Sequence, residues 1–211
     1  MKKIIAIVST LSVLASASAF AKTEGNYIGF DLHRASVDAI DNNLSQAADP
    51  RYVHRETSKT GVGLSYKHAF NLGNNIFIAP GAFYERIGIK QYYSPNNGTD
   101  ENRLSIKNRY GIRADIGYDI NDNLAVYATA GVSRTGYKIA LGDAHTGTLE
   151  NDKSKLAMLY GVGFTSKVNE DLTLGFEFNT QRFSVKQHDQ SSDIRTKIVL
   201  DVYKVTLGYH F

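Results

Sequence analysis

The sequence predicts an all-β fold, an eight-stranded antiparallel up-and-down transmembrane β-barrel. Eight segments alternate apolar and polar residues with a period of two, which is typical of strands with one apolar face. One of them, 103–120, is longer than an ordinary strand of about 5–6 residues and fits a strand that crosses a bilayer obliquely in about 9–11 residues and continues beyond it. The connections alternate in length from long to short, so all tight turns lie at one end of a meander.

The first 21 residues predict a secretory signal peptide. MKKIIAIVSTLSVLASASAFA begins with Lys2 and Lys3, continues with an apolar stretch too short to span a bilayer, and ends with Ala19 and Ala21 flanking one residue. We therefore expect export and cleavage near Ala21. The mature chain, 22–211, is expected to form one barrel domain.

Charge and cysteine content narrow the class of protein. The chain has 24 Lys and Arg and 21 Asp and Glu, so loss of Lys2 and Lys3 leaves 22 basic residues against 21 acidic ones. This near balance gives no reason to expect a nucleic-acid partner. The sequence has no cysteine, which excludes disulfides and a lipid-attachment thiol.

The first three strand segments differ in how clearly they alternate. The apolar positions are Ile28, Phe30 and Leu32 in 25–37, and Val62, Leu64 and Tyr66 in 60–70. A polar turn, 71–75, follows the second segment. In the third segment, 76–93, Ile78 and Phe83 are both apolar although they have opposite parity, so the pattern leaves the register of this strand open.

The fourth segment, 103–120, is the most regular. Its apolar face holds Leu104, Ile106, Tyr110, Ile112, Ala114, Ile116 and Tyr118, and only Asn108 interrupts it. Its other face holds Ser105, Lys107, Arg109, Gly111, Arg113, Asp115 and Gly117. A strand with one wholly apolar face and one charged face is expected where lipid lies on one side and a polar interior on the other.

The last four segments continue the alternation. Their apolar positions are Leu124, Val126, Ala128, Ala130 and Val132 in 124–139; Leu156, Met158, Tyr160, Val162 and Phe164 in 155–168; Leu172, Leu174, Phe176 and Phe178 in 172–185; and Tyr203, Val205, Leu207, Tyr209 and Phe211 in the closing segment, VYKVTLGYHF. The turns NDN and NED join the fourth segment to the fifth and the sixth to the seventh. The pattern thus gives eight strands.

The connections predict how the barrel is oriented and closed. In chain order they are 38–57, 71–75, 93–102, 120–123, 140–154, 168–171 and 186–196. Outer-membrane barrels have short periplasmic turns and long outer loops. Because an open sheet edge in lipid would leave backbone groups unpaired, the last strand must pair with the first, and Tyr203, Tyr209 and Phe211 are expected to face lipid.

These features resemble the family of small eight-stranded bacterial outer-membrane barrels, which includes the OmpA transmembrane domain, OmpX and the opacity-type surface proteins. The resemblance covers the whole mature chain and includes the segment GYDINDNLAVYATAGV, 117–132, and the terminal VTLGYHF. It implies a monomer in outer-membrane lipid, inserted by the outer-membrane insertion machinery. In that family the machinery reads a terminal aromatic with alternating apolar residues, which here are Tyr203, Leu207, Tyr209 and Phe211.

Charged residues on the inward parity predict a polar network inside the barrel. They are Lys67, Glu85, Lys107, Arg109, Arg113, Asp115, Glu177 and Lys204. One interpretation is a gated ion path. The other, which we favour, is a plug of salt bridges, because eight strands enclose only enough room for side chains and buried charges must be paired.

Histidines give no pattern typical of a catalytic or metal site. His54, His145 and His188 fall in three outer connections, and His188 lies near Asp189 and Ser191, but no pair has a spacing such as H-x-x-x-H. His33, His68 and His210 are interpreted as barrel-wall residues. We therefore expect no cofactor, no metal and no enzymatic activity.

The favoured functional hypothesis is an outer-membrane surface protein that displays four loops for adhesion or another interaction with a host or extracellular ligand, or that maintains the envelope. Tyr and Arg dominate binding hot spots, so the candidate contact residues are Arg51, Tyr52, Arg55, Tyr92 and Tyr93. A narrow porin-like channel is the alternative, and a lipid-modifying outer-membrane enzyme is the third hypothesis.

Overall fold

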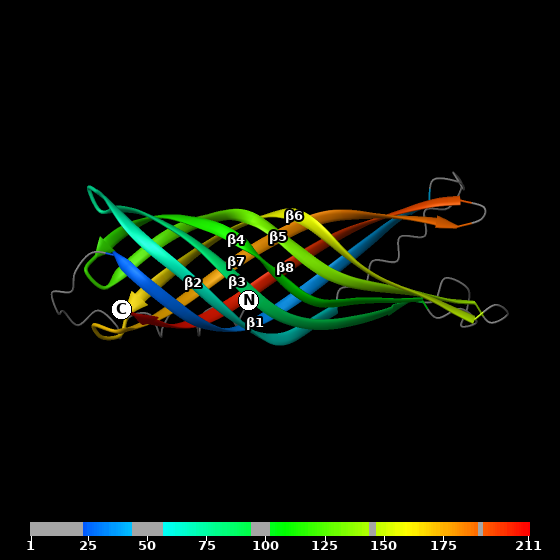
Figure 1. Cartoon of the computed structure of the whole chain (residues 1–211), viewed down its shortest axis with the longest axis horizontal. Coiled ribbons are helices and arrows are strands. Elements are labelled where there is room, and N and C mark those ends of the chain that lie inside the picture. The colour runs from blue at the N-terminus through cyan, green and yellow to red at the C-terminus, as the bar shows by residue number, and fades with distance from the viewer. Residues whose placement is uncertain (1–22, 44–56, 94–101, 144–146, 190–191) are drawn as a thin grey trace, which may run out of the picture.

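The computed structural model describes residues 23–43, 57–93, 102–143, 147–189 and 192–211, and these form a closed barrel of eight strands. The strands are β1 (Gly25–Asn43), β2 (Thr57–Gly73), β3 (Ile76–Tyr93), β4 (Asn102–Asn121), β5 (Leu124–Asp143), β6 (Gly147–Lys167), β7 (Leu172–Asp189) and β8 (Ser192–His210). Figure 1 shows the strands running obliquely along one long axis. Among the described residues no helix is long and apolar enough to cross a membrane.

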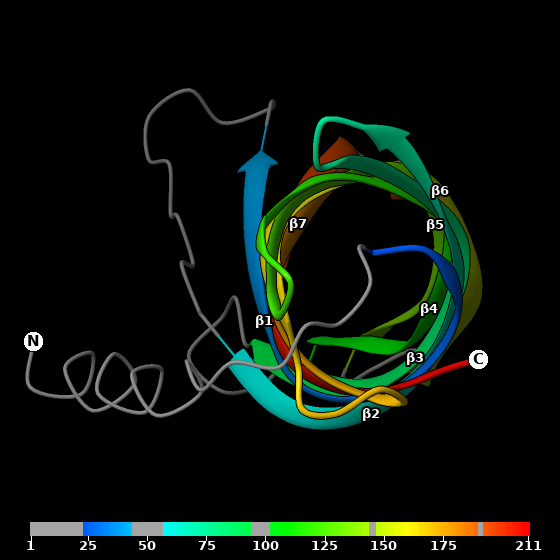
Figure 2. The same ribbon diagram turned by 90° about the vertical axis from the view of Figure 1, so that its left-hand side faces the viewer.

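Closure of the barrel rests on the pairing of β1 with β8. The two strands pair antiparallel from Tyr27 opposite His210 to Asn43 opposite Ile194. Beyond the last strand residue, the backbone N–H of Phe211 donates to the carbonyl of Asn26 at 3.0 Å, and the Asn26 N–H donates to the Phe211 carbonyl at 3.2 Å. The end-on view in Figure 2 shows the resulting closed ring, and the predicted eight-stranded antiparallel barrel is confirmed.

Asparagine side chains stabilise the three tight turns, which lie together at the left-hand end of Figure 1. Asn71 accepts a hydrogen bond from the backbone N–H of Gly73, and Asn121 accepts from the N–H groups of Asn123 and Leu124. Asn169 forms the same pair of contacts with Asp171 and Leu172. Local side-chain acceptance of this kind is why asparagine favours turns.

Outward-facing apolar side chains form a band around the end of the barrel that carries the turns. On β4 this band runs from Tyr110 to Tyr118 and Ile120, and on β8 from Tyr203 to Phe211 at the terminus. These spans match the 9–11 residues that a tilted strand needs to cross a bilayer. The exposed apolar surface of this chain is therefore its lipid contact.

Beyond the band, at the opposite end, the strands are longer than the sequence pattern predicts. They contain 17 to 21 residues each. The boundaries predicted for the outer connections 38–57, 140–154 and 186–196 are therefore wrong, because β1, β5, β6, β7 and β8 continue well into these ranges. Outside lipid a strand has no need of an apolar outer face, so alternation cannot reveal where it ends.

A β-bulge at Lys107 reverses the parity of β4. Asn108 pairs with Gly136 of β5 and Ile106 pairs with Tyr137, which leaves Lys107 as the extra residue. On the other side of β4, Ile87 and Gly88 of β3 stand opposite the same point, and Gly88 has a φ of 68°. As a result Leu104 and Ile106 point into the barrel, so their predicted place on the lipid-facing side is wrong.

The half of the barrel opposite the turns, which the loop pattern predicts to be extracellular, opens into two facing sheets. Toward this end, the backbone pairing of β2 with β3 stops at Val62 opposite Arg86. The pairing of β6 with β7 stops at Leu159 opposite Gln181. Figure 1 shows the right-hand end dividing into two arms, one with β7, β8 and β1 and the other with β3, β4, β5 and β6. Between the sheets lies an apolar core of Ala35, Val37, Ile87, Ile89, Leu104, Ile106, Tyr137, Phe183, Val185, Ile198, Leu200 and Val202, which we call the extracellular core.

Candidate functional site

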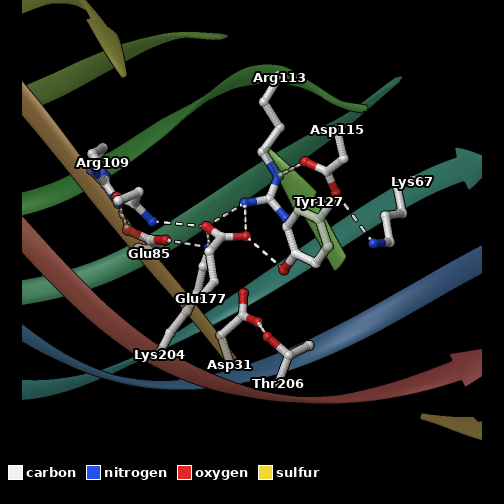
Figure 3. A network of polar contacts seen from close by, with 11 residues as sticks. Asp31, Lys67, Glu85, Arg109, Arg113, Asp115, Tyr127, Glu177, Lys204 and Thr206 are labelled. Atoms are coloured by element: carbon white, nitrogen blue, oxygen red, sulfur yellow. Dashed lines mark hydrogen bonds and ion pairs between the residues drawn. The ribbon is translucent and has the colours of Figure 1, made fainter. Parts of the chain in front are cut away.

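A chain of ion pairs crosses the barrel interior at the level of the apolar band (Figure 3). The Arg109 guanidinium of β4 donates to Glu85 of β3, with Nη2 at 2.6 Å and Nε at 2.9 Å from Oε2. Lys204 of β8 bridges two carboxylates, with Nζ at 3.2 Å from Glu85 Oε1 and 3.0 Å from Glu177 Oε1. Arg113 Nη1 lies 2.7 Å from both Glu177 oxygens. The chain therefore joins strands on opposite sides of the lumen.

A second branch of the network leads toward the turns. Asp115 lies 3.6 Å from Arg113 Nε and 3.2 Å from the Lys67 ammonium of β2. On the opposite wall, Thr206 donates a hydrogen bond of 2.5 Å to Asp31 of β1. The network drawn in Figure 3 thus holds four cations and four carboxylates, and its formal charge is balanced.

Neutral side chains fix the orientation of the charged groups. Asn179 accepts from Arg109 at 2.8 Å and donates to Glu177 at 2.8 Å, and the Tyr127 hydroxyl donates to Glu177 at 3.0 Å. Three cations lie over the Phe83 ring, at 5.4 Å for the Arg109 guanidinium carbon, 6.0 Å for that of Arg113 and 5.7 Å for the Lys204 ammonium. These contacts compensate part of the desolvation that a buried charge costs.

Apolar layers lie on both sides of the charged network. Toward the outside is the extracellular core, with Ile106, Ile198 and Leu200 completely buried. Toward the turns is a cluster of Tyr27, Ala69, Phe77, Ala79, Ala125 and Tyr127. A pocket of about 50 Å³ opens at this end near Lys67, Asp119 and Lys167. The extracellular core thus covers the charged layer on the outer side, whereas on the turn side the apolar cluster covers it in part, because Lys67 and Arg113 also line the pocket.

A known protein family matches almost the whole length of the chain. The model of the outer membrane protein beta-barrel domain matches residues 7–211. The chain belongs to this family. No significant sequence match was found among curated proteins.

Solved structures of outer-membrane proteins resemble this family member in fold. Ail, the attachment invasion locus protein of Yersinia pestis, is 13% identical with a TM-score of 0.51, and the match covers 90% of this chain and 100% of Ail. OprG from Pseudomonas aeruginosa is 12% identical with a TM-score of 0.56, covering 90% of this chain and 98% of OprG. At this identity the likeness concerns the fold.

Seven of the eight interior charges predicted for this outer-membrane barrel lie inside it and contact one another. They are Lys67, Glu85, Arg109, Arg113, Asp115, Glu177 and Lys204. The prediction is wrong for Lys107, whose side chain lies on the outer surface at the bulge and pairs with Asp152. The open register of β3 is also decided, because Glu85 faces inward and is completely buried.

Several polar residues of the interior were not singled out from the sequence. Asp31, Asn179 and Gln181 are buried inside the barrel. His33, predicted as a wall residue, is also buried on the inner face. All four occupy inward-facing positions of their strands. Alternation therefore predicts that they lie inside the barrel, but it does not by itself mark them as part of a network, because three of them carry no full charge.

The predicted surface sites have a different status. Arg51, Tyr52 and Arg55 lie outside the described residues, as do His54 and His145. Tyr92 and Tyr93 end β3, where they pair with Arg103 and Asn102. No group of three His, Cys, Asp or Glu suited to a metal ion occurs in the described ranges.

The terminal residues predicted as the assembly signal face outward. Tyr203, Leu207, Tyr209 and Phe211 are each about half exposed, at 50–57%. Tyr209 and Phe211 stack with ring centroids 6.2 Å apart. Their place in the lipid-facing band of this outer-membrane barrel is thus fixed by the structure, whereas the assembly role remains a prediction.

Proposed function

We propose that this outer-membrane protein is a display barrel: a monomer without enzymatic activity whose extracellular end contacts a host or extracellular ligand. The observation that carries the proposal is the filled interior. A charge-balanced network crosses the lumen at Arg113, Glu177 and Lys204, and the extracellular core covers it. A barrel closed in this way is suited to present a surface rather than to pass solutes.

The length of the strands beyond the lipid band supports the same function. On β1, the outward face carries Leu32 in the band, and the strand continues to Asn43. Packing of the two extracellular sheets against each other gives the connections a rigid base. Rigid frames that carry variable segments are a common arrangement for recognition.

The proposed contact residues are those of the first two outer connections and their margins. Arg51, Tyr52 and Arg55 fall between β1 and β2, and Tyr92 and Tyr93 end β3. Arg and Tyr combine large contact area with polar groups, which makes them frequent hot spots. Assembly by the insertion machinery, through the terminal aromatic residues, is part of the same proposal.

Two measurements on the full chain test display. Binding of labelled host cells or matrix proteins is compared between bacteria that carry the wild type and bacteria in which 44–56 is replaced by a short Gly-Ser linker. The display function requires binding that falls with the replacement. The unfolding midpoint is expected to stay nearly unchanged, because β1 and β2 are outside the replaced range.

Planar-bilayer recording supplies the second measurement. The wild type is expected to show little or no steady conductance, because an ion would have to pass the extracellular core and break paired charges. Large, stable conductance that survives the 44–56 replacement would reject display in favour of a narrow channel. Turnover of lipids by the purified protein would reject it in favour of an enzyme.

A further inference from the structure

Four arginines occupy equivalent places on the four strands that run from the turns toward the extracellular end. They are Arg34 of β1, Arg86 of β3, Arg134 of β5 and Arg182 of β7. Each side chain is exposed on the outer wall. Three of the arginines are followed four positions later by a lysine, at Lys90, Lys138 and Lys186. The same motif thus recurs on alternate strands around the barrel.

The stagger of the barrel places these arginines at one height. Paired residues traced once around the barrel from Tyr27 return to β1 at Val37, ten residues further on. Each step to the next strand therefore rises by about 1.25 residues. When this rise is subtracted, all four arginines fall within about two residues of the same level. They form a ring, which we call the arginine ring.

Tyrosines mark the level directly below the arginine ring. Tyr84, Tyr110, Tyr160 and Tyr203 all point outward and are 44–51% exposed. By the same stagger they share one level, about two residues closer to the turns. Aromatic girdles of this kind lie at the boundary between hydrocarbon and headgroups. The arginine ring therefore lies at the height of the lipid headgroups on the extracellular side.

Nothing matching the arginine ring occurs at the other boundary in the described chain. The exposed charges near the turns include Glu24, Asp122, Glu170 and Asp171. The outer wall is thus basic at the extracellular interface, whereas the turns and the residue before β1 are acidic at the other end. Basic side chains attract anionic lipid headgroups, so this difference in charge favours anionic lipids on the extracellular side of the membrane.

The four arginines differ in the hydrogen bonds and the nearby carboxylates of their guanidinium groups. Arg34 and Arg134 each donate to a hydroxyl, Ser58 and Ser154, at 2.7 Å. No ion pair between described residues involves Arg86 or Arg182. Two carboxylates of the outer wall, Asp38 and Asp201, lie near Arg34 and weaken the positive potential there, and Asp201 is also a diagonal neighbour of Arg182. The most favourable place for an anion therefore lies between Arg86 and Arg134, followed by Arg182, which has one carboxylate beside it where Arg34 has two.

We infer that the arginine ring binds the phosphate groups of outer-leaflet lipids and so fixes the depth of the barrel. The phosphate of a lipid whose chains lie against the apolar band reaches the height of the ring. The guanidinium fork matches phosphate oxygens in a bidentate geometry. The ligand is a phosphorylated lipid, because the ring lies at the edge of the lipid-covered surface and not in an enclosed pocket.

Lipid retention measured by native mass spectrometry tests this site. The full chain is purified in neutral detergent and supplied with lipid A that carries two phosphates, or with the same lipid after removal of its phosphates. We expect the wild type to retain the phosphorylated lipid at least about tenfold better. Inorganic phosphate at the same concentration is expected neither to bind detectably nor to displace the lipid.

Two triple variants separate the ring from overall charge. In the first, Arg86, Arg134 and Arg182 are each changed to Gln. In the matched control, Lys153, Lys155 and Lys197 are each changed to Gln; these exposed lysines lie about two to five residues further out. The ring variant is expected to lose about tenfold or more in retention of phosphorylated lipid, and the control less than about twofold.

Folding of both variants is verified first by the shift in gel migration between unboiled and boiled samples. Equal retention by the ring variant and the wild type overturns the proposal. So does an equal loss in the lysine control, undiminished retention of the dephosphorylated lipid, or displacement by inorganic phosphate. A third variant with Arg86, Arg134 and Arg182 changed to Lys is expected to keep part of the affinity, because charge remains without the bidentate fork.

Discussion

Glu85 and Arg109 form a completely buried pair in which both contacting nitrogens of the guanidinium donate to one carboxylate oxygen, at 2.6 and 2.9 Å. The other oxygen of Glu85 faces Lys204 at 3.2 Å. One carboxylate on β3 therefore holds cations from β4 and β8. Loss of this carboxylate would remove one ion-pair partner from both Arg109 and Lys204 inside the barrel.

The first prediction concerns this carboxylate. Glu85→Ala is expected to lower the free energy of unfolding by about 3–5 kcal/mol, because removal of one partner from a buried ion pair leaves an uncompensated charge. Urea titration of the protein in lipid vesicles, followed by the gel shift between unboiled and boiled samples, measures this change.

A matched control is Asp152→Ala, which removes the partner of Lys107. Those two side chains are 59% and 49% exposed. Exposed ion pairs contribute about 0–1 kcal/mol, so this variant is expected to unfold almost as the wild type does. Similar losses in the two variants would contradict the claim that the Glu85–Arg109 pair is buried and tightly coupled to its neighbours.

The second prediction concerns the extracellular core. Leu200→Ala removes a completely buried side chain from β8, and a cavity of this kind costs about 2–5 kcal/mol. Because the core lies outside the lipid band, the two facing sheets are expected to loosen while the membrane part stays closed. Proteinase K added to intact cells should therefore cleave the variant faster, and the remaining barrel should keep its gel shift.

Lys197→Ala is the control for this variant, since Lys197 lies three positions away on the same strand with an exposed side chain. Its protease sensitivity is expected to match that of the wild type. If Leu200→Ala resisted the protease equally well, the core would not be what holds the two sheets together.

Sequence alternation identified the strands that face lipid because lipid imposes a strict chemical difference between the two sides of each strand. It placed Arg113, Glu177 and Lys204 inside correctly, since each lies on a regular part of its ladder. It misplaced Lys107, because a bulge adds one residue without changing composition. A sequence shows no sign of such an insertion until the partner strand is known.

The extracellular region was harder to predict for a different reason. The segment 140–154 is rich in polar residues and was expected to be a loop, yet β5 and β6 stay paired as far as Asp143 opposite Gly147. In water both faces of a strand tolerate polar residues, so the periodic signal disappears while the backbone ladder continues. The common level of the arginine ring was hidden likewise, because it depends on the stagger between strands.

The third prediction uses two glycines on neighbouring strands. A Cβ added at Gly163 would lie 2.5 Å from Cζ of Tyr127 and 2.7 Å from the carbonyl oxygen of Phe176. Gly163→Ala must displace the Tyr127 ring, whose hydroxyl donates to Glu177, and is expected to cost about 1–3 kcal/mol. At Gly175 the nearest atom is 3.5 Å away, in Thr206, which is ordinary contact.

Gly175→Ala is therefore expected to leave the free energy of unfolding within about 1 kcal/mol of the wild type, because its Cβ fits without displacement. Urea unfolding in the same vesicles measures both variants. Equal stability of the two variants would mean that the Tyr127 ring is loosely packed and can move to accommodate an added methyl group.

The fourth prediction separates two roles of the terminal residue. Deletion of Phe211 removes the two backbone hydrogen bonds to Asn26 and the aromatic ring that stacks on Tyr209, whereas Phe211→Ala removes only the ring. If the ring is the assembly signal, both variants reach the outer membrane slowly and accumulate before insertion, as measured by pulse-labelling and the gel shift. Once inserted, Phe211→Ala should unfold close to the wild type, and the deletion should be less stable because the barrel seam has lost its last backbone pair. Normal assembly of Phe211→Ala would exclude the ring as the signal and leave the terminal residue a structural role in closing β8 on β1.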